Sequence, residues 1–137
     1  MEASARSSAD ARGLMQLLPS TARMVARRAN MSSPSANDLY DPGTNIGLGS
    51  YHLAWLIARY DGQTPLAIAA YNAGEHRIDR WIKEAEGLPM DVWIERIPFR
   101  ETRNYVKNVL AFRHVYSNKM NALTPMLGVN ERVVRIP

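Results

Sequence analysis

The stretch TPLAIAAYNAG, residues 64–74, sets the fold prediction. Thr64 is a favoured helix N-cap, and Pro65 suits the first helical turn, where its missing N–H costs nothing. The apolar run that follows predicts a short helix reaching about Tyr71. Gly74 suits the left-handed conformation that ends many helices, so we expect the helix to stop there.

Helical patterns extend on both sides of this stretch. Residues 30–42 are rich in Ser, Pro, Asn and Asp, a composition typical of a loop. The other predicted helices cover residues 19–29, 45–60, 75–86, 90–96 and 100–119. The longest of them carries a predicted buried stripe made of Tyr105, Val106, Val109, Leu110, Phe112 and Tyr116.

The sequence therefore predicts a mainly α-helical protein, with at most a short strand or two. Its 137 residues fit one compact domain with one hydrophobic core. There is no internal repeat, low-complexity segment or linker, so we predict a single domain over residues 1–137. Residues 121–137 contain two prolines and are expected to form an irregular C-terminal tail.

The formal net charge is +4, and most of the basic residues are arginines. Arginine suits anionic partners, because its planar fork matches carboxylates and phosphates, although a generic basic surface explains the charge equally well. The basic residues are spread along the chain without a run of like charges. The charge pattern therefore gives no sign of a nucleic-acid-binding tail.

Several classes of site and segment are excluded by composition. The chain has no cysteine, and the spacing of its three histidines does not suit metal ligands, so we expect no metal and no cofactor. The glycines between residues 43 and 49 lack the lysine and preceding strand of a phosphate-binding loop. No stretch reaches the roughly 18 apolar residues that span a bilayer. The first twelve residues lack the apolar core of a signal peptide.

Four local patterns stand out in the sequence. They are Gly-Leu-Met-Gln at 13–16, Asp-Pro with a later Asn-Ile at 41–46, Ala-Tyr-Asn-Ala-Gly at 70–74, and Ile-Pro-Phe-x-Glu-Thr-Arg-x-Tyr-Val at 97–106. Each has a simple local explanation. Gly74 can merely end a helix, and Glu101 can be an acid stabilised by a helix dipole.

In this order and spacing, however, the patterns carry a specific resemblance. The chain resembles the soluble lytic transglycosylase (SLT) domain, a relative of goose-type lysozyme, over about residues 4–120. The first, third and fourth patterns match the motifs of that family without substitution. The fourth also resembles the branch of large, ring-shaped soluble transglycosylases.

The resemblance implies a lysozyme-like helical fold with a groove for the glycan strands of peptidoglycan. The family cuts the bond between N-acetylmuramic acid and N-acetylglucosamine without water and leaves 1,6-anhydromuramyl ends. One glutamic acid acts first as an acid and then as a base on the muramyl 6-hydroxyl. Because the nucleophile belongs to the sugar, the second carboxylate of ordinary glycosidases is not needed.

The resemblance also assigns substrate-binding roles by position. Gln16 would hydrogen-bond sugar near the cleaved bond, and Ser7 would contact the muramyl residue. Tyr71 would orient the acid or the substrate, Asn72 would shape the same turn, and Glu101 would be a second, binding acid in the groove. The apolar walls of the groove would come from Met15, Leu17 and Leu18.

The chain departs from the family at the catalytic acid. In the family the catalytic glutamate is followed by serine and lies well upstream of the Gly-Leu-Met-Gln motif, at a position that here falls before Met1. We therefore expect that the chain is a fragment truncated relative to the family, or that it starts at an internal methionine, and that its cleavage activity is impaired. The alternative is that Glu2 has taken over the acid role, but an exposed carboxylate at a flexible terminus is a poor general acid at neutral pH.

Three functions compete on this basis. The first is a peptidoglycan lytic transglycosylase, and the second is a catalytically inactive peptidoglycan-binding module. The third, a basic helical nucleic-acid binder, rests on charge alone, and no recognition helix or stacking motif supports it. The resemblance places the site of action in the periplasm or cell envelope. Without the acid-bearing helix, an apolar face is expected to be exposed, which favours self-association.

Overall fold

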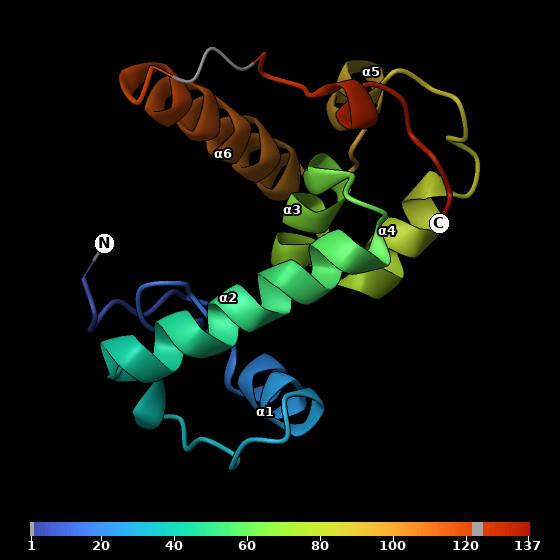
Figure 1. Ribbon diagram of the computed structural model, residues 1–137. Coiled ribbons are helices and arrows are strands. Elements are labelled where there is room, and N and C mark those ends of the chain that lie inside the picture. Colours follow the sequence, from blue (N-terminus) through green and yellow to red (C-terminus); the bar gives the residue numbers. More distant parts are fainter. Residues whose placement is uncertain (1, 122–124) are drawn as a thin grey trace. The chain divides into compact units, whose positions relative to one another are not determined.

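The computed structural model describes residues 2–121 and 125–137, and these residues are mainly helical (Figure 1). The α-helices are α1 (Pro19–Arg28), α2 (Pro42–Arg59), α3 (Thr64–Ala73), α4 (Glu75–Ile82), α5 (Met90–Glu95) and α6 (Arg100–Lys119). Two short 3-10 helices cover Asp38–Tyr40 and Val129–Glu131. Extended pairing within the described residues is limited to isolated bridges, so the predicted mainly helical fold class is confirmed.

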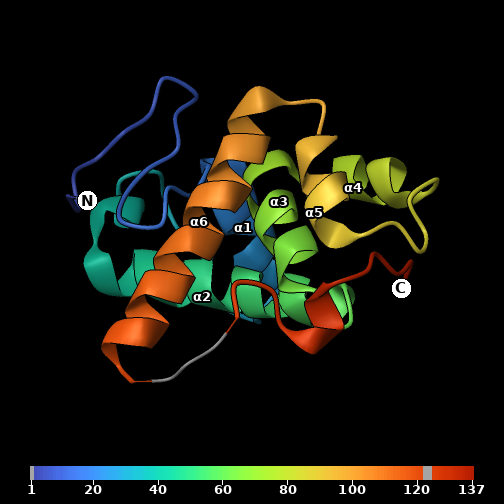
Figure 2. The ribbon, with the colours of Figure 1, turned by 90° about the horizontal axis from the view of Figure 1, so that it is seen from above.

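The chain divides into two compact units, Met1–Ala54 and Trp55–Pro137, with the boundary inside α2. The first unit contains α1, most of α2 and the irregular N-terminal segment that precedes α1 (Figure 2). Its interior is small and is formed by apolar residues of α1, α2 and the loop between them. These residues are Ala22, Val25, Ala26, Leu39 and Leu48.

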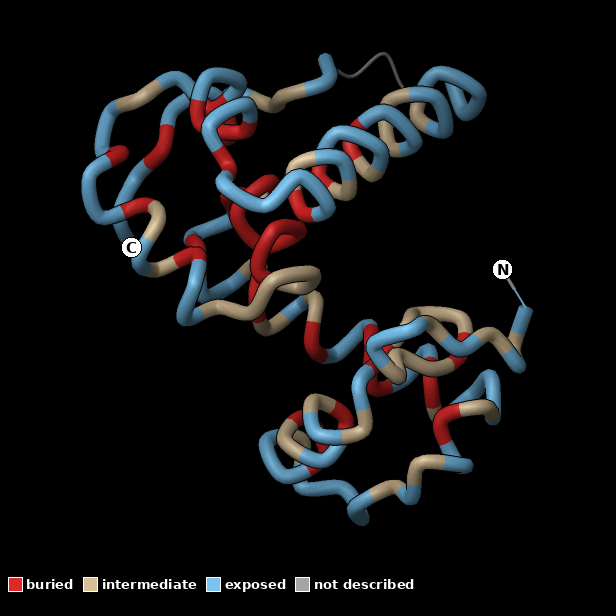
Figure 3. The backbone as a smooth tube through the Cα atoms, turned by 180° about the vertical axis from the view of Figure 1, so that it is seen from behind, coloured by how far each residue is buried: buried red, intermediate tan, exposed pale blue. Residues whose placement is uncertain are grey.

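The second unit is organised around α3, which packs against α6 and α4. Residues 65–70 of α3 form an unbroken buried run, visible in Figure 3. A helix with no polar face in its middle turns can be stable only if it is covered on all sides. The sequence TPLAIAAYNAG therefore makes α3 the centre of the second hydrophobic core.

Three predicted helix ends were wrong. Thr64, predicted to be the N-cap of α3, is its first helical residue, and the N-cap is Gln63. Helix α2 begins at Pro42 instead of residue 45, because the Asp41 carboxylate accepts hydrogen bonds from both the backbone N–H and the hydroxyl of Thr44, at 2.9 Å each. Helix α4 ends at Ile82 instead of residue 86. Beyond it the chain turns so that Ala85 enters the core, where this residue is only 5% exposed.

The predicted buried stripe of α6 was wrong in its second half. Val106 and Leu110 are buried, whereas Phe112 and Tyr116 are each 63% exposed. Each residue of a helix turns the side chain by about 100°, so Phe112 lies on the face opposite Leu110. Buried positions of α6 instead recur every four residues, at Thr102, Val106 and Leu110.

Buried polar groups hold the described part of the C-terminal segment in place. Gln63 is fully buried, and its amide donates to Arg135 O at 2.8 Å and accepts from the Arg135 N–H at 2.7 Å. Glu131 accepts two hydrogen bonds from the Arg113 guanidinium, both at 2.8 Å. Of the predicted tail, residues 122–124 lie outside the described part of the chain.

Candidate functional site

The Gly-Leu-Met-Gln motif forms a tight hairpin turn between Arg12 and Leu17. The Arg12 N–H donates to Leu17 O at 2.8 Å, and the Leu17 N–H donates to Arg12 O at 3.0 Å. Inside this pair, the Gln16 N–H donates to Gly13 O at 3.1 Å. Gln16 has a φ of +50°, a left-handed conformation that is uncommon for a non-glycine residue and often marks a functional position.

Gly13 is required by the turn for two reasons. Its φ of +76° is unfavourable for residues with a Cβ atom. A Cβ at this position would also lie 2.3 Å from Leu39 O and 2.3 Å from the Asn45 side-chain nitrogen. The turn therefore fits closely against the loop before α2 and against the first turn of α2 itself.

Asn45 fixes the position of the motif. Its side chain is fully buried, its Nδ2 donates to Arg12 O at 2.8 Å and to Leu39 O at 2.9 Å, and its Oδ1 accepts from the Met15 N–H at 2.7 Å. Two of these bonds tie the turn to α2, and the third ties α2 to the 3-10 helix before it. Asn45 belongs to the second sequence pattern, but nothing local in the sequence indicates partners about thirty residues away.

Helix α2 also packs closely on Met15. A Cβ on Gly49 would lie 2.5 Å from Met15 Sδ, so the glycine allows the Met15 side chain to rest on the helix. Of the three residues expected to line an apolar wall, Leu17 is 2% exposed and belongs to the interior. Leu18 is 39% exposed and remains available to a ligand.

The Gln16 side chain is partly used within its own turn. Its Nε2 donates to Gly13 O at 2.8 Å and to Ala5 O at 3.4 Å. No described donor reaches its carbonyl oxygen. The fixed amide therefore presents a hydrogen-bond acceptor of defined orientation, which suits the hydroxyl or N-acetyl N–H groups of a sugar.

Ser7 lies in a second turn of the same N-terminal segment. Its hydroxyl oxygen accepts from the Ala11 N–H at 3.0 Å, and its backbone N–H donates to Ala11 O at 2.9 Å. Asp10 follows with a φ of +67°. Hydrogen bonds from Arg12 and then Arg6 hold the pKa of the Asp10 carboxyl below its usual range. Ser7 thus has a structural role in a turn, and its hydroxyl hydrogen remains free to donate.

Tyr71 and Asn72 lie together at the end of α3, in the second unit. Burial is the main cause that raises the pKa of Tyr71, and the neighbouring Tyr105 raises it further. The Tyr71 hydroxyl is therefore protonated and able to donate at neutral pH. Asn72 Oδ1 accepts from the Thr102 hydroxyl at 2.7 Å. This bond joins the end of α3 to the start of α6. Thr102 belongs to the fourth sequence pattern, but nothing local in the sequence indicates that it bonds to Asn72.

The two acidic residues of the predicted site are both exposed. Glu101 lies in the first turn of α6, where the helix dipole favours its charge. Glu2 precedes the first turn of the chain, and its backbone carbonyl accepts from the Ala5 N–H at 3.0 Å. Neither carboxylate makes a hydrogen bond or ion pair with a described residue.

The predicted site residues therefore form two clusters, one in each unit. Ser7 and Gln16 occupy the turns before α1. The turn that contains Gln16 hydrogen-bonds to Ala5 O, and the turn that contains Ser7 lies close to Ala5 in the sequence. Tyr71, Asn72 and Glu101 occupy the junction of α3 with α6. Among the described residues no cluster of His, Asp or Glu suits a metal ion.

Among the described residues, three carboxyl groups have shifted pKa values, and all three shift downward. They are Asp10, Asp41, which the Thr44 N–H and hydroxyl stabilise, and Glu131. Burial alone would raise the pKa of Glu131, but hydrogen bonds from Arg113 and the Gly128 N–H outweigh it and lower the pKa to about 2. A general acid needs the opposite shift, because it has to keep its proton near neutral pH. None of the three therefore suits that role.

Comparison with known families identifies the domain. The family model of the transglycosylase SLT domain matches residues 1–94, well over half of the chain. The chain belongs to the transglycosylase SLT domain family. The model of the soluble lytic transglycosylase helical domain matches residues 96–124 of this SLT chain. The predicted family resemblance is confirmed.

Individual relatives agree with this assignment. A soluble lytic murein transglycosylase of Escherichia coli K12 is 34% identical over 128 residues, covering 92% of the SLT chain and 20% of the relative. The crystal structure of the 70-kDa soluble lytic transglycosylase of E. coli has a TM-score of 0.91 and 33% identity, and the match covers 97% of this chain and 22% of that one.

A second solved structure is an inactive glutamate-to-glutamine mutant of the lytic transglycosylase Slt from Pseudomonas aeruginosa. It shares 44% identity with a TM-score of 0.87, and the match covers 96% of this chain and 21% of that one. The SLT chain thus spans about a fifth of the length of the curated relatives it matches. No described helix is long and apolar enough to cross a bilayer.

Proposed function

We propose that this SLT domain binds the glycan strands of peptidoglycan in the periplasm or cell envelope. Its reaction is the non-hydrolytic cleavage of the β-1,4 bond from N-acetylmuramic acid to N-acetylglucosamine. The match of the SLT family model to residues 1–94 carries this proposal. The names of the relatives, which are murein transglycosylases, support the substrate class.

The reaction needs one acid that changes role. A protonated glutamic acid donates its proton to the glycosidic oxygen as the bond from that oxygen to the anomeric carbon breaks. The resulting carboxylate then removes the proton of the muramyl 6-hydroxyl, whose oxygen bonds to the anomeric carbon and closes the 1,6-anhydro ring. The inactive mutant of the P. aeruginosa relative, in which glutamine replaces a glutamate, supports a glutamic acid in this role.

The residues of this chain supply binding and orientation. The carbonyl of Gln16, fixed by its own turn, accepts from a sugar hydroxyl or N-acetyl N–H. The protonated Tyr71 hydroxyl donates to the substrate or to the acid. Ser7 donates to the muramyl residue, Asn72 holds the Tyr71 turn through Thr102, and Glu101 accepts from sugar hydroxyls.

Glu2 is a poor candidate for the acid. It is exposed, whereas a general acid that works at neutral pH needs apolar surroundings. We therefore propose that this chain binds glycan strands but cleaves them slowly. The alternative function, a peptidoglycan-binding module without catalysis, is favoured by the same observation.

The binding proposal is tested by co-sedimentation of the chain with purified sacculi. We expect the wild type to sediment, and Gln16→Ala and Tyr71→Phe to bind several-fold more weakly, because each loses one polar contact with the sugar. Asn37→Ala serves as the control, since Asn37 is exposed and belongs to neither cluster. Failure of the wild-type chain to sediment would contradict the proposal.

We further propose that the exposed apolar face of α6 drives self-association. Phe112, Val115, Tyr116 and Met120 are 63%, 47%, 63% and 78% exposed and lie on one side of the helix. Sedimentation velocity should reveal a concentration-dependent dimer that Phe112→Lys abolishes. Val92→Lys, at an exposed apolar position of α5, should leave it intact. A wild type that stays monomeric at millimolar concentration would refute this.

A further inference from the structure

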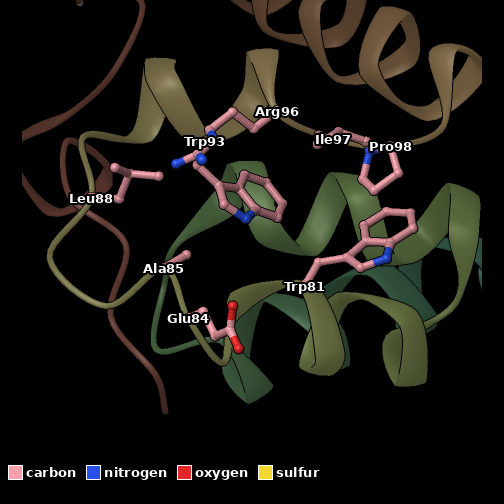
Figure 4. Close-up of a pocket in the computed structure, with 8 residues that line it drawn as sticks. All are labelled: Trp81, Glu84, Ala85, Leu88, Trp93, Arg96, Ile97 and Pro98. Atoms are coloured by element: carbon pink, nitrogen blue, oxygen red, sulfur yellow. The ribbon is translucent and has the colours of Figure 1, made fainter.

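A pocket of about 210 Å³ opens between α4 and α5, apart from the predicted site residues. Two tryptophans, Trp81 and Trp93, form its walls, and Ile97 and Pro98 extend its apolar surface (Figure 4). Drug-sized ligands occupy pockets of about 300–1,000 Å³. This pocket is therefore suited to a single residue or end group of a larger molecule.

The walls of the pocket are firmly placed. Trp93 is 3% exposed and lies in the hydrophobic core. Trp81 packs edge-to-face on Phe99, with ring centroids 5.1 Å apart and an interplanar angle of 76°. The Arg77 guanidinium lies over the Phe99 ring, 5.0 Å from its centroid. The pocket thus offers preformed aromatic surface to the methylene groups of a ligand.

Two opposite charges border this apolar surface. Glu84 comes from the turn after α4 and Arg96 from the end of α5, and in Figure 4 they approach the Trp93 indole from opposite sides. Neither side chain makes a hydrogen bond or ion pair with a described residue. Some other charges of this unit do form ion pairs, as Arg59 does with Asp79 and Lys107 with Glu95.

We propose that this pocket binds an amino-acid end group that carries both a free ammonium and a free carboxylate. Arg96 pairs with the carboxylate in the geometry that guanidinium favours, and Glu84 pairs with the ammonium. The methylene groups between the two charges pack on Trp93 and Trp81. A neutral sugar would leave both protein charges without a partner, and a simple anion or cation would leave one.

The inference deepens the proposed function and rests on it for the source of the ligand. Peptidoglycan strands carry peptide stems, and a diamino-acid residue in such a stem has an ammonium and a carboxylate at the end of its side chain. A pocket for this group would make the domain prefer strands with peptide stems over bare glycan. A free diamino acid presents the same chemistry, and the experiment separates the two sources.

The test follows the indole N–H resonances of Trp81 and Trp93 by NMR during titration. The probes are free diaminopimelate, a muropeptide that carries it, and the same muropeptide with the end amine acetylated. Trp55 lies outside the pocket and serves as an internal reference. We expect both pocket indoles to shift with the first two probes, and the acetylated probe to bind about tenfold more weakly, as loss of one charge-assisted bond implies.

Paired variants separate binding from folding. Arg96→Gln and Glu84→Gln, both at exposed positions, should each weaken binding about tenfold, while Arg80→Gln on α4 should leave it unchanged. If free diaminopimelate binds as tightly as the muropeptide, the ligand of the pocket is a free amino acid. Unshifted pocket indoles, or equal shifts with a peptide-free disaccharide, would overturn the inference.

Its failure is distinguishable from failure of the proposed function. If the chain sediments with sacculi but its pocket indoles do not respond, only the inference about the pocket is wrong. If the indoles respond to the zwitterionic probe but the chain does not sediment with sacculi, the pocket stands as an amino-acid site and the peptidoglycan proposal falls.

Discussion

The N-terminal turns and the α3 core are held together by different physics. The turn at residues 13–16 depends on specific hydrogen bonds to the buried Asn45 and on a glycine with no room for a Cβ atom. Helix α3 instead depends on burial of six consecutive residues, 65–70. Binding residues in the first region are therefore positioned by polar groups, whereas those at the end of α3 are positioned mainly by packing of the helix, with one bond from the Thr102 hydroxyl to Asn72 Oδ1.

The largest expected effect tests the packed region. Leu66 is fully buried, so Leu66→Ala should lower the free energy of unfolding by about 3 kcal/mol through lost burial and a residual cavity. Val115→Ala, at a 47% exposed position, should change it by less than about 0.5 kcal/mol. Urea denaturation measures both. Similar small losses for the two variants would show that α3 is not the centre of a close-packed core.

The next effect tests the hydrogen-bonded region. Asn45→Ala removes the side-chain hydrogen bonds to Arg12 O, Leu39 O and the Met15 N–H, and we expect a loss of about 2 kcal/mol in the free energy of unfolding. Hydrogen exchange at the Leu17 amide should accelerate, while amides of α3 stay protected. Asn37→Ala is the matched control. If exchange at Leu17 is unchanged, Asn45 does not hold the turn.

A smaller effect depends on pH and concerns Glu131. Its folded pKa of about 2 lies below the ordinary value, so its ionised form stabilises the fold above about pH 4.5, and this contribution is lost as pH falls toward 2. Glu131→Gln should therefore lower stability by about 1–2 kcal/mol at pH 7 and by less at pH 3. Thermal melts of both proteins at the two pH values measure this. If the difference in stability between the two proteins is the same at both pH values, the ion pair is not its cause.

The smallest stability effect is expected at Gln16. Replacing it by glycine removes the strain of a φ of +50° and the bonds to Gly13 O and Ala5 O, so the free energy of unfolding should change by less than about 1 kcal/mol. Binding to sacculi should nevertheless weaken several-fold. Loss of stability and binding together would make Gln16 a structural residue instead of a binding one.

Predictions from the sequence were most accurate where the signal is local. The bounds of α6 and the start of α1 at Pro19 follow from periodicity and first-turn residues, and both are as predicted. The early start of α2 depends on the Asp41 cap, a cue that the loop-like composition around it obscured. Exposure of Phe112 and Tyr116 depends on which face of α6 meets α3, which periodicity alone does not specify.

The sequence identified some residues of the candidate site and not others, because only some of them have a local signal. Gln16 and Tyr71 lie in motifs that match a known family, so the resemblance singled them out. Asn45 and Thr102 act through bonds to residues about thirty positions away, and a single sequence gives no sign of such pairs. The roles assigned to Ser7, Gln16, Tyr71, Asn72 and Glu101 stay predictions.

The central claim is that this SLT domain binds glycan strands and that Glu2 is not an effective acid. Mass spectrometry of the soluble products after incubation with purified peptidoglycan tests it most directly, with Glu2→Gln measured alongside. We predict that both proteins sediment with the sacculi and release equally low amounts of 1,6-anhydromuropeptides. Abundant 1,6-anhydromuropeptides from the wild type that vanish in Glu2→Gln would contradict the account and make Glu2 the catalytic acid.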